Sequence, residues 1–360
     1  MIDYARWHLD RSLLFALLAL SGIGLVTLYS ASGASLEVVL RHGLRLAAGF
    51  ALLVIVAQAR PETLARWSPY VFGLGLILLA TVLLAGTTSK GAQRWLNLGL
   101  TRIQPSEFMK LCLPMVLAWY FARGNLPPRL HRFGLAALIV SVPAVLIARQ
   151  PDLGTAVLLA ASGLIVLFLA GLGWRTILVL AGGLGAAVPF AWAYLHDYQR
   201  QRILTLLDPS SDPLGRGYHT IQSVIAVGSG GFFGKGWLNS SQAHLEYLPE
   251  SSTDFVFAVF AEEFGLVGIA LLLALYLFIT GRGLLIALFA QDSYTRLLAG
   301  GLVLSFFVYF FVNIGMVTGI LPVVGVPLPL ISYGGTSVVT ILAGFGMLMS
   351  IHTHRKIAAH

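Results

Sequence analysis

The sequence predicts an all-α, polytopic membrane protein of about ten transmembrane helices with one large extracytoplasmic loop. Hydrophobic residues make up 57% of the 360 residues and charged residues only 11%, whereas a soluble domain carries about 25% charged residues. At about 20 residues per spanning helix, this apolar content is enough for about ten spans. The composition excludes a soluble globular protein, a disordered chain and a nucleic-acid-binding module with a dense basic face.

Apolar runs separated by polar residues, glycine or proline mark the predicted spans within a single domain of residues 1–360. The first run reads as a retained helix, because further spans follow and no small-residue cleavage site is evident. The fourth run is short unless its helix begins at Pro105, which suits a first helical turn. The runs are 12–31, 44–59, 68–85, 108–122, 133–148, 153–170, 176–194, 255–280, 296–321 and 337–351.

Charge indicates the orientation only weakly. The 23 Lys and Arg residues divide almost evenly between the two sides, so the excess of cations that marks cytoplasmic loops does not decide it. Cations on one side cluster with Trp, Asn, Gln, Asp and Gly in a few segments, which suits an anionic ligand. We therefore place this side outside and both termini in the cytoplasm. The single cysteine, Cys112, excludes a disulfide within the chain.

The only long polar connection covers residues 196–253 and is expected to be functional rather than a linker. Arg200 and Arg202 are able to grip phosphate oxygens bidentately, and Arg216 follows in a glycine-flanked stretch. Glycines at 228–236 would let the backbone approach a ligand closely. The run has no Walker motif, so nucleotide hydrolysis has no support.

Ionisable residues also enter the membrane helices. Glu107 and Lys110 stand at i,i+3 at the start of the fourth span, after Arg102. Such a pair in a membrane helix marks a functional site by default, although a structural ion pair is the alternative. Asp152 pairs with Arg149 or lines the same outer cavity.

Asp254 lies where the eighth span begins, after a stretch of candidate helix N-caps. The helix dipole favours its ionised form, which makes it an available though weak base at neutral pH. Its simpler role is to cap the helix. Glu262 and Glu263 lie deeper and need polar partners in the bundle.

The segment before the last span, residues 321–337, contains three prolines and three glycines, which forbid a regular helix. Irregular backbone near membrane depth is tolerated only where protein or a wet cavity satisfies it. The segment is either part of a site or a tight re-entrant connection. It ends at Ser337.

Six motifs in this order resemble those of the SEDS family (shape, elongation, division and sporulation), closest to its rod-shape branch. The resemblance covers nearly the whole chain. The motifs are KGAQRWLNLG (90–99), RIQPSEFMK (102–110), QPDLGTA (150–156), LGRGYHTIQSVIAVGSGGFFGKG (214–236), LPESSTDFVFAVFAEEFG (248–265) and PLPLISYGGTS (327–337).

The resemblance implies a peptidoglycan glycosyltransferase of the bacterial cytoplasmic (inner) membrane, polymerising lipid II on the extracytoplasmic side for cell elongation. It implies a class B penicillin-binding transpeptidase as partner, membrane lipids around the bundle, no organic cofactor, and room for a divalent cation, Mg²⁺ or Mn²⁺, at an unknown site. Asp254 matches the essential aspartate of the family. The expected substrate-binding residues are Lys110, Glu107, Arg102, Asp152, Arg200, Arg202, Arg216 and Ser337.

Two other functions fit parts of the sequence. A lipid II flippase also places polar residues inside the bundle and interrupts a helix with proline, but the paired interrupted helices of such transporters are not seen here. A non-catalytic scaffold that activates a transpeptidase would need no base at Asp254.

Overall fold

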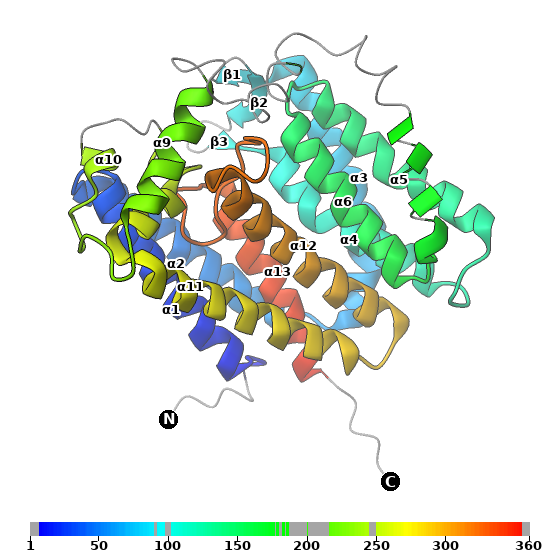
Figure 1. Cartoon of the computed structure of the whole chain (residues 1–360). Helices are drawn as coiled ribbons and strands as arrows, with labels where there is room; N and C mark the ends of the chain where they lie inside the picture. The colour runs from blue at the N-terminus through cyan, green and yellow to red at the C-terminus, as the bar shows by residue number, and fades with distance from the viewer. Residues whose placement is uncertain are drawn as a thin grey trace.

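The computed structural model describes residues 7–89, 92–97, 102–176, 178–179, 182–183, 185–186, 200, 216–244 and 250–354, and every statement below refers to these. Its helices run side by side as a bundle (Figure 1). Helix α1 begins and helix α13 ends at one end of the bundle, while the strands and helix α9 lie at the opposite end. The connection between α12 and α13, coloured orange, lies among the helices near that second end.

Most of the described chain is helical. Seven helices are long and apolar enough to cross a membrane, namely α1, α2, α3, α5, α11, α12 and α13. Nine of the ten predicted runs lie on helices, and the run 176–194 falls largely outside the described residues. A multi-pass helical protein is thus confirmed, and the number ten stays a prediction. The bounds are α1 Arg11–Ala31, α2 Leu36–Gln58, α3 Pro61–Ala85, α4 Pro105–Ala122, α5 Leu130–Ala148, α6 Leu153–Leu169, α11 Val256–Leu288, α12 Ser293–Val317 and α13 Thr336–Thr353.

Helices α2 and α3 begin well before the apolar runs that predicted them. Helix α2 begins at Leu36, where the run begins at 44, and its first turns carry an i,i+4 ion pair between Glu37 and Arg41. Helix α3 begins at Pro61, where the run begins at 68, and proline at a first helical position loses no hydrogen bond. Polar side chains end an apolar run without ending the helix.

A small antiparallel sheet departs from the predicted all-α fold. Strands β1 (Thr87–Ser89), β2 (Ala92–Asn97) and β3 (Arg102–Ile103) pair in the order β1-β2-β3. Leu96 pairs with Ile103 and Asn97 with Arg102. The strands are two to six residues long, too short for a periodic pattern, so the sequence analysis did not predict them.

Helices α12 and α13 form the centre of the bundle. In their most apolar stretches 67% and 61% of the residues are buried, against 22% in α2 and α3. Helix α13 packs extensively on α2, and α12 packs on α4, α6 and α11. Gly49 of α2 fits against Leu342 of α13, as expected for membrane helices that approach closely at small residues.

Helix α11 is kinked at Gly265, which has a φ of 62° that favours glycine. The glycine-rich segment 230–236 covers the kink with its backbone. Leu266 N–H donates to Gly231 O at 2.9 Å, and Lys235 N–H donates to Glu262 O at 3.0 Å. These glycines therefore approach helix α11, and a close approach to a ligand stays a prediction.

The long connection at 196–253 contains helices in its described part. Helix α9 (Arg216–Ser229) packs against α11, and the short helix α10 (Ser241–His244) follows. Ser223 of α9 donates its hydroxyl to Val317 O at the end of α12, at 2.9 Å. This connection is thus folded onto the bundle near the start of α11.

Candidate active site

Asp254 is half-buried, immediately before helix α11. The N-cap of α11 is Phe255, whose own side chain makes no cap hydrogen bond. Asp254 therefore precedes the N-cap by one residue, and its simpler role as a cap stays a prediction. Its Oδ2 would lie 3.3 Å from a Cβ placed on Gly325, so the carboxylate faces the connection between α12 and α13.

The residues before Asp254 bind that connection through their backbone. Ser332 donates its hydroxyl to Thr253 O at 2.5 Å and accepts from Leu328 N–H at 2.7 Å. Tyr333 N–H donates to Ser252 O at 2.9 Å. The protein thus satisfies this irregular backbone, as its position near membrane depth requires.

Asn313 of α12 connects the segment that contains Asp254 with the proline-rich connection between α12 and α13. Its Nδ2 donates to Asp254 O at 3.0 Å and to Val326 O at 2.6 Å, and the side chain is fully buried. One amide therefore holds both the Asp254 backbone and the proline-rich connection. The sequence analysis missed Asn313, although a lone asparagine within an apolar span is a signal of function.

Glu107 and Lys110 form the predicted ion pair, with 2.6 Å between Oε1 and Nζ. Their side chains are only 6% and 11% exposed, and Nζ lies 4.6 Å from the centroid of the Tyr309 ring. Tyr309 precedes Asn313 by four residues on α12, so the two side chains are neighbours on one helix face. The ion pair and Asp254 consequently contact the same face of α12 one turn apart.

A small cleft adjoins Lys110 between α4, α12 and α13. Its walls are mainly apolar and include Phe306, Ile341 and Phe345. An apolar cleft with one ammonium group at its wall suits a lipid that carries a negative charge.

Asp152 caps α6 and forms an ion pair with the small sheet. It accepts from Thr155 N–H at 3.2 Å, and its Oδ2 lies 3.5 Å from Nε of Arg94 in β2. Of the predicted alternatives, a pair with Arg149 is replaced by this pair with the sheet. Gly154 packs directly on Val324, so the start of α6 also touches the proline-rich connection.

The other predicted site residues are less closely grouped. Arg102 is exposed in β3, and Ser337 is partly buried in the first turn of α13. Arg216 begins α9, but its side chain lies outside the described part, as do Arg202 and the residues flanking Arg200. The predicted grip of these arginines on a phosphate stays a prediction.

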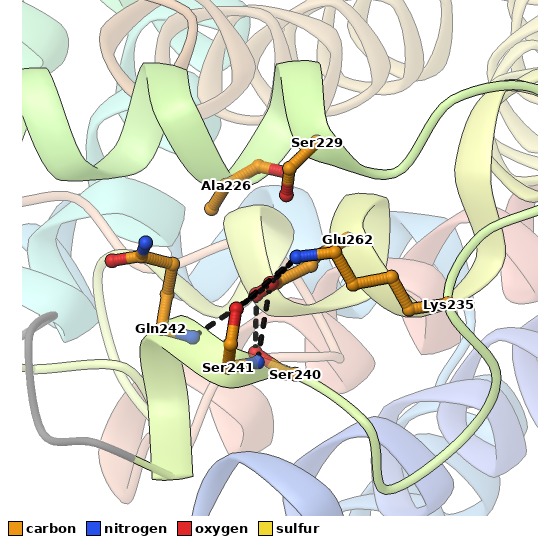
Figure 2. A network of polar contacts seen from close by, with 7 residues as sticks. All are labelled: Ala226, Ser229, Lys235, Ser240, Ser241, Gln242 and Glu262. Atoms are coloured by element: carbon orange, nitrogen blue, oxygen red, sulfur yellow. Dashed lines mark hydrogen bonds and ion pairs between the residues drawn. The ribbon is translucent and has the colours of Figure 1, made fainter.

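Glu262 lies two turns along α11 and is fully buried. Figure 2 shows the donors that surround it. Lys235 Nζ and the hydroxyls of Ser240 and Ser241 each lie 2.6 Å from its carboxylate oxygens. Glu263 accepts from Ser30 of α1. The predicted need of both glutamates for polar partners is confirmed.

The described residues offer no obvious metal site. No group of three or more His, Cys, Asp or Glu side chains among them is placed to hold a metal ion. A divalent cation bound to this protein therefore stays a prediction.

A family model of cell cycle proteins, named for FtsW, RodA and SpoVE, matches residues 11–357. The chain belongs to this family. The peptidoglycan glycosyltransferase MrdB of Escherichia coli K12 is 54% identical over 97% of this chain and 95% of its own length. MrdB of Helicobacter pylori J99 is 39% identical over 88% of this chain and 84% of its own length.

Solved structures agree with this assignment. A chain from a study of polymerization and crosslinking by a peptidoglycan synthase complex has a TM-score of 0.84 and 36% identity, covering 95% of this chain and 97% of its own. The rod shape determining protein RodA of Thermus thermophilus has a TM-score of 0.73 and 30% identity, covering 96% and 98%. The predicted SEDS membership and rod-shape branch are confirmed.

Proposed function

We propose that this chain polymerises lipid II into glycan strands for cell elongation and that Asp254 is its general base. It is a peptidoglycan glycosyltransferase, in keeping with the name of the relative that is 54% identical over nearly the full chain. The observation that carries the role of Asp254 is its fixed backbone, which Asn313 bonds directly and Ser332 and Tyr333 bond through the preceding residues. A base held in place loses little to reorganisation during reaction.

The proposed reaction is a single displacement. The GlcNAc 4-hydroxyl of one lipid-linked disaccharide attacks C1 of the MurNAc at the reducing end of the growing chain, and Asp254 takes the proton. Undecaprenyl diphosphate leaves from C1. One base without a second carboxylate nucleophile predicts inversion at the anomeric carbon, by the logic of inverting sugar chemistry.

Negative charge develops on the leaving diphosphate and needs cations that are already in place. Lys110 is held by its ion pair with Glu107 and lies against Tyr309 of α12. Arg102, Arg200, Arg202 and Arg216 are the further proposed donors. Asp152 and Ser337 border the site. We assign no step to a protein-held metal, since a Mg²⁺ or Mn²⁺ ion would be carried by the diphosphate itself.

For localisation we propose the bacterial cytoplasmic (inner) membrane, with both termini in the cytoplasm and the active site outside. Helix α1 begins and helix α13 ends at one end of the bundle, and the strands and helix α9 lie at the other, which supports this orientation (Figure 1). A class B penicillin-binding transpeptidase is the proposed partner, and loop 196–253 its contact surface. The similarity to a chain of a peptidoglycan synthase complex supports a partner of this kind.

An assay with purified protein, lipid II and a divalent ion tests the proposal. The glycan chains that form are detected on a gel. Asp254→Asn is expected to abolish polymerisation with normal folding, because the amide is isosteric but cannot take the proton. Asp292→Asn is the matched control, since Asp292 caps α12 through Thr295 N–H at 2.9 Å, and asparagine caps helices as well as aspartate does.

Wild-type turnover in Asp254→Asn would remove Asp254 as the base. Absence of chains in the wild type, with lipid II moving across proteoliposome membranes, would favour the flippase. Absence of both, with a transpeptidase that gains activity on binding, would favour the scaffold.

A further inference from the structure

Arg45 of α2 is a half-buried cation within a membrane-spanning helix. Its guanidinium carbon lies 4.6 Å from the centroid of the Tyr333 ring. Among the described residues it has no hydrogen bond or ion pair, whereas Arg41, one turn earlier, pairs with Glu37. A charge at membrane depth is costly without a counter-charge. The structure thus leaves one cation on α2 to be neutralised by a ligand.

His42 lies one turn from Arg45 and contacts the same tyrosine. Its ring centroid is 5.8 Å from that of Tyr333, and the side chain is fully buried. Neither ring nitrogen has a hydrogen-bond partner in the described part of the chain. Buried polar groups are normally bonded, because an unpaired one costs free energy. A second polar group beside Tyr333 therefore also lacks a partner.

The N-terminus of α13 lies next to these two side chains. Gly335 is its N-cap and no side chain caps the helix. A Cβ on Gly335 would lie 3.9 Å from both Cζ and Nε of Arg45. The free N–H groups of a first turn and the helix dipole attract anions. Positive potential from α2 and from α13 consequently meets at one place.

We propose that Arg45, His42 and the first turn of α13 form a binding site for the phosphate group of a membrane lipid. Guanidinium is suited to two parallel hydrogen bonds to phosphate oxygens. The site borders the catalytic segment, because Tyr333 N–H is bonded to Ser252 O, two residues before Asp254. The diphosphate of the lipid-linked substrate is the expected occupant. That identity rests on the proposed function, whereas the phosphate site does not.

Lipid binding to the full chain in phosphatidylcholine nanodiscs tests the site. The two probes are undecaprenyl diphosphate and phosphatidylglycerol, with retained lipid counted by native mass spectrometry. Arg45→Gln is expected to bind undecaprenyl diphosphate at least about tenfold more weakly, since a hydrogen bond to a charged group contributes about 1.5–3 kcal/mol. Arg123→Gln is the control, because Arg123 also lies over an aromatic ring, Trp119, at 4.0 Å.

Selective loss of undecaprenyl diphosphate in Arg45→Gln supports a substrate subsite. If the wild type retains both lipids equally and Arg45→Gln loses both, the occupant is a phospholipid headgroup. The substrate assignment is then wrong. If Arg45→Gln retains both lipids as well as the wild type does, the proposed site is wrong.

Two further variants keep the test decisive. If Arg45→Gln does not fold, Arg45→Lys takes its place, because it keeps the charge but loses the planar fork, and several-fold weaker binding is expected. Asp292→Asn, which keeps the cap of α12, is expected to bind both lipids as the wild type does. A polymerase assay that fails for the wild type would thus reject the proposed function without changing the outcome for the site.

Discussion

At the scale of single residues, this site depends on side chains that hold backbone rather than substrate. Asn313 makes two hydrogen bonds from one buried amide, to Asp254 O and Val326 O. Tyr276 donates its hydroxyl to Pro329 O at 2.7 Å from within α11. Both keep the proline-rich connection next to Asp254. The position of the proposed base is therefore determined by residues that never touch the sugar.

We expect Asn313→Leu to lower kcat strongly and to change KM less, because Asp254 loses its support while substrate contacts stay. Each buried carbonyl left without a donor costs about 1–3 kcal/mol, so the unfolding midpoint should fall as well. Glycan-chain assays at equal folded protein measure the first effect and thermal unfolding the second.

Ser68→Ala is the control for Asn313→Leu. Ser68 is buried and lies 3.0 Å from the Tyr294 hydroxyl, far along α3 from the site. Its loss should lower stability by about 1 kcal/mol with unchanged kcat. An Asn313→Leu protein that turns over normally when folded would show that α12 does not position Asp254.

At the scale of elements, the kink in α11 and the segment around Glu262 act together. Gly265 breaks the regular helix, and the backbone of residues 231–236 bonds the groups exposed there. Glu262 then binds Lys235, Ser240 and Ser241 through its side chain. A polar loop is thereby fastened to a membrane helix by one buried carboxylate.

Glu262→Gln is expected to release this loop without unfolding the bundle. The change removes a charged acceptor, worth about 1.5–3 kcal/mol per hydrogen bond, whereas Lys235 is 36% exposed and is able to reach water. Hydrogen exchange should therefore accelerate in residues 235–244 and stay unchanged in α13. Glu37→Gln, which breaks an exposed ion pair, should change neither. Uniform acceleration in both variants would contradict a local fastening.

At the scale of the whole molecule, the end that carries both termini is joined by a polar cluster. Asp10 caps α1, and its carboxylate lies 2.6 Å from Nη2 of Arg282 in α11 and 3.4 Å from Nε2 of His352 in α13. The rings of His8 and His354 stack at 3.9 Å. Helices far apart in the sequence are held together here, opposite the site.

Acidification should loosen this end through Asp10. Burial raises the pKa of its carboxyl, but the hydrogen bonds from Arg282 and Leu13 N–H outweigh it, so the pKa lies below 3.8. A depressed pKa contributes stability above pH 3.8 that is lost as the pH falls through the folded-state value. The wild type should exceed Asp10→Asn in free energy of unfolding by about 1–2 kcal/mol at pH 7.

The difference between the two proteins should vanish below the folded-state pKa, as thermal unfolding at stepped pH would measure. In an Arg282→Gln background the difference made by Asp10→Asn should be smaller at neutral pH, since the main partner of Asp10 is absent. A constant difference down to acid pH would show that the contribution of Asp10 is not electrostatic.

Composition and motifs alone determined the class of molecule and its family. With only 11% charged residues, the chain consists mainly of apolar runs that are evident in the sequence. Each run that spans the bilayer must bond its own backbone groups, which a helix does. Local spacing also sufficed for the Glu107–Lys110 pair, since residues three apart on a helix are neighbours. Asp254 was identified from the motif 248–265 that contains it. These features depend on short stretches of chain.

The tertiary structure decided which residues meet. Asp254 was expected to be the base, with helix capping as the alternative, but nothing local predicted that the connection 321–335, some 70 residues later, binds the segment before it. A pair with Arg149 was one of two alternatives for Asp152, but Arg94 in an unpredicted strand approaches it. Arg45, His42 and Asn313 gained their importance only from neighbours on other helices. Contacts between distant segments depend on how the helices pack, which spacing along the chain does not encode.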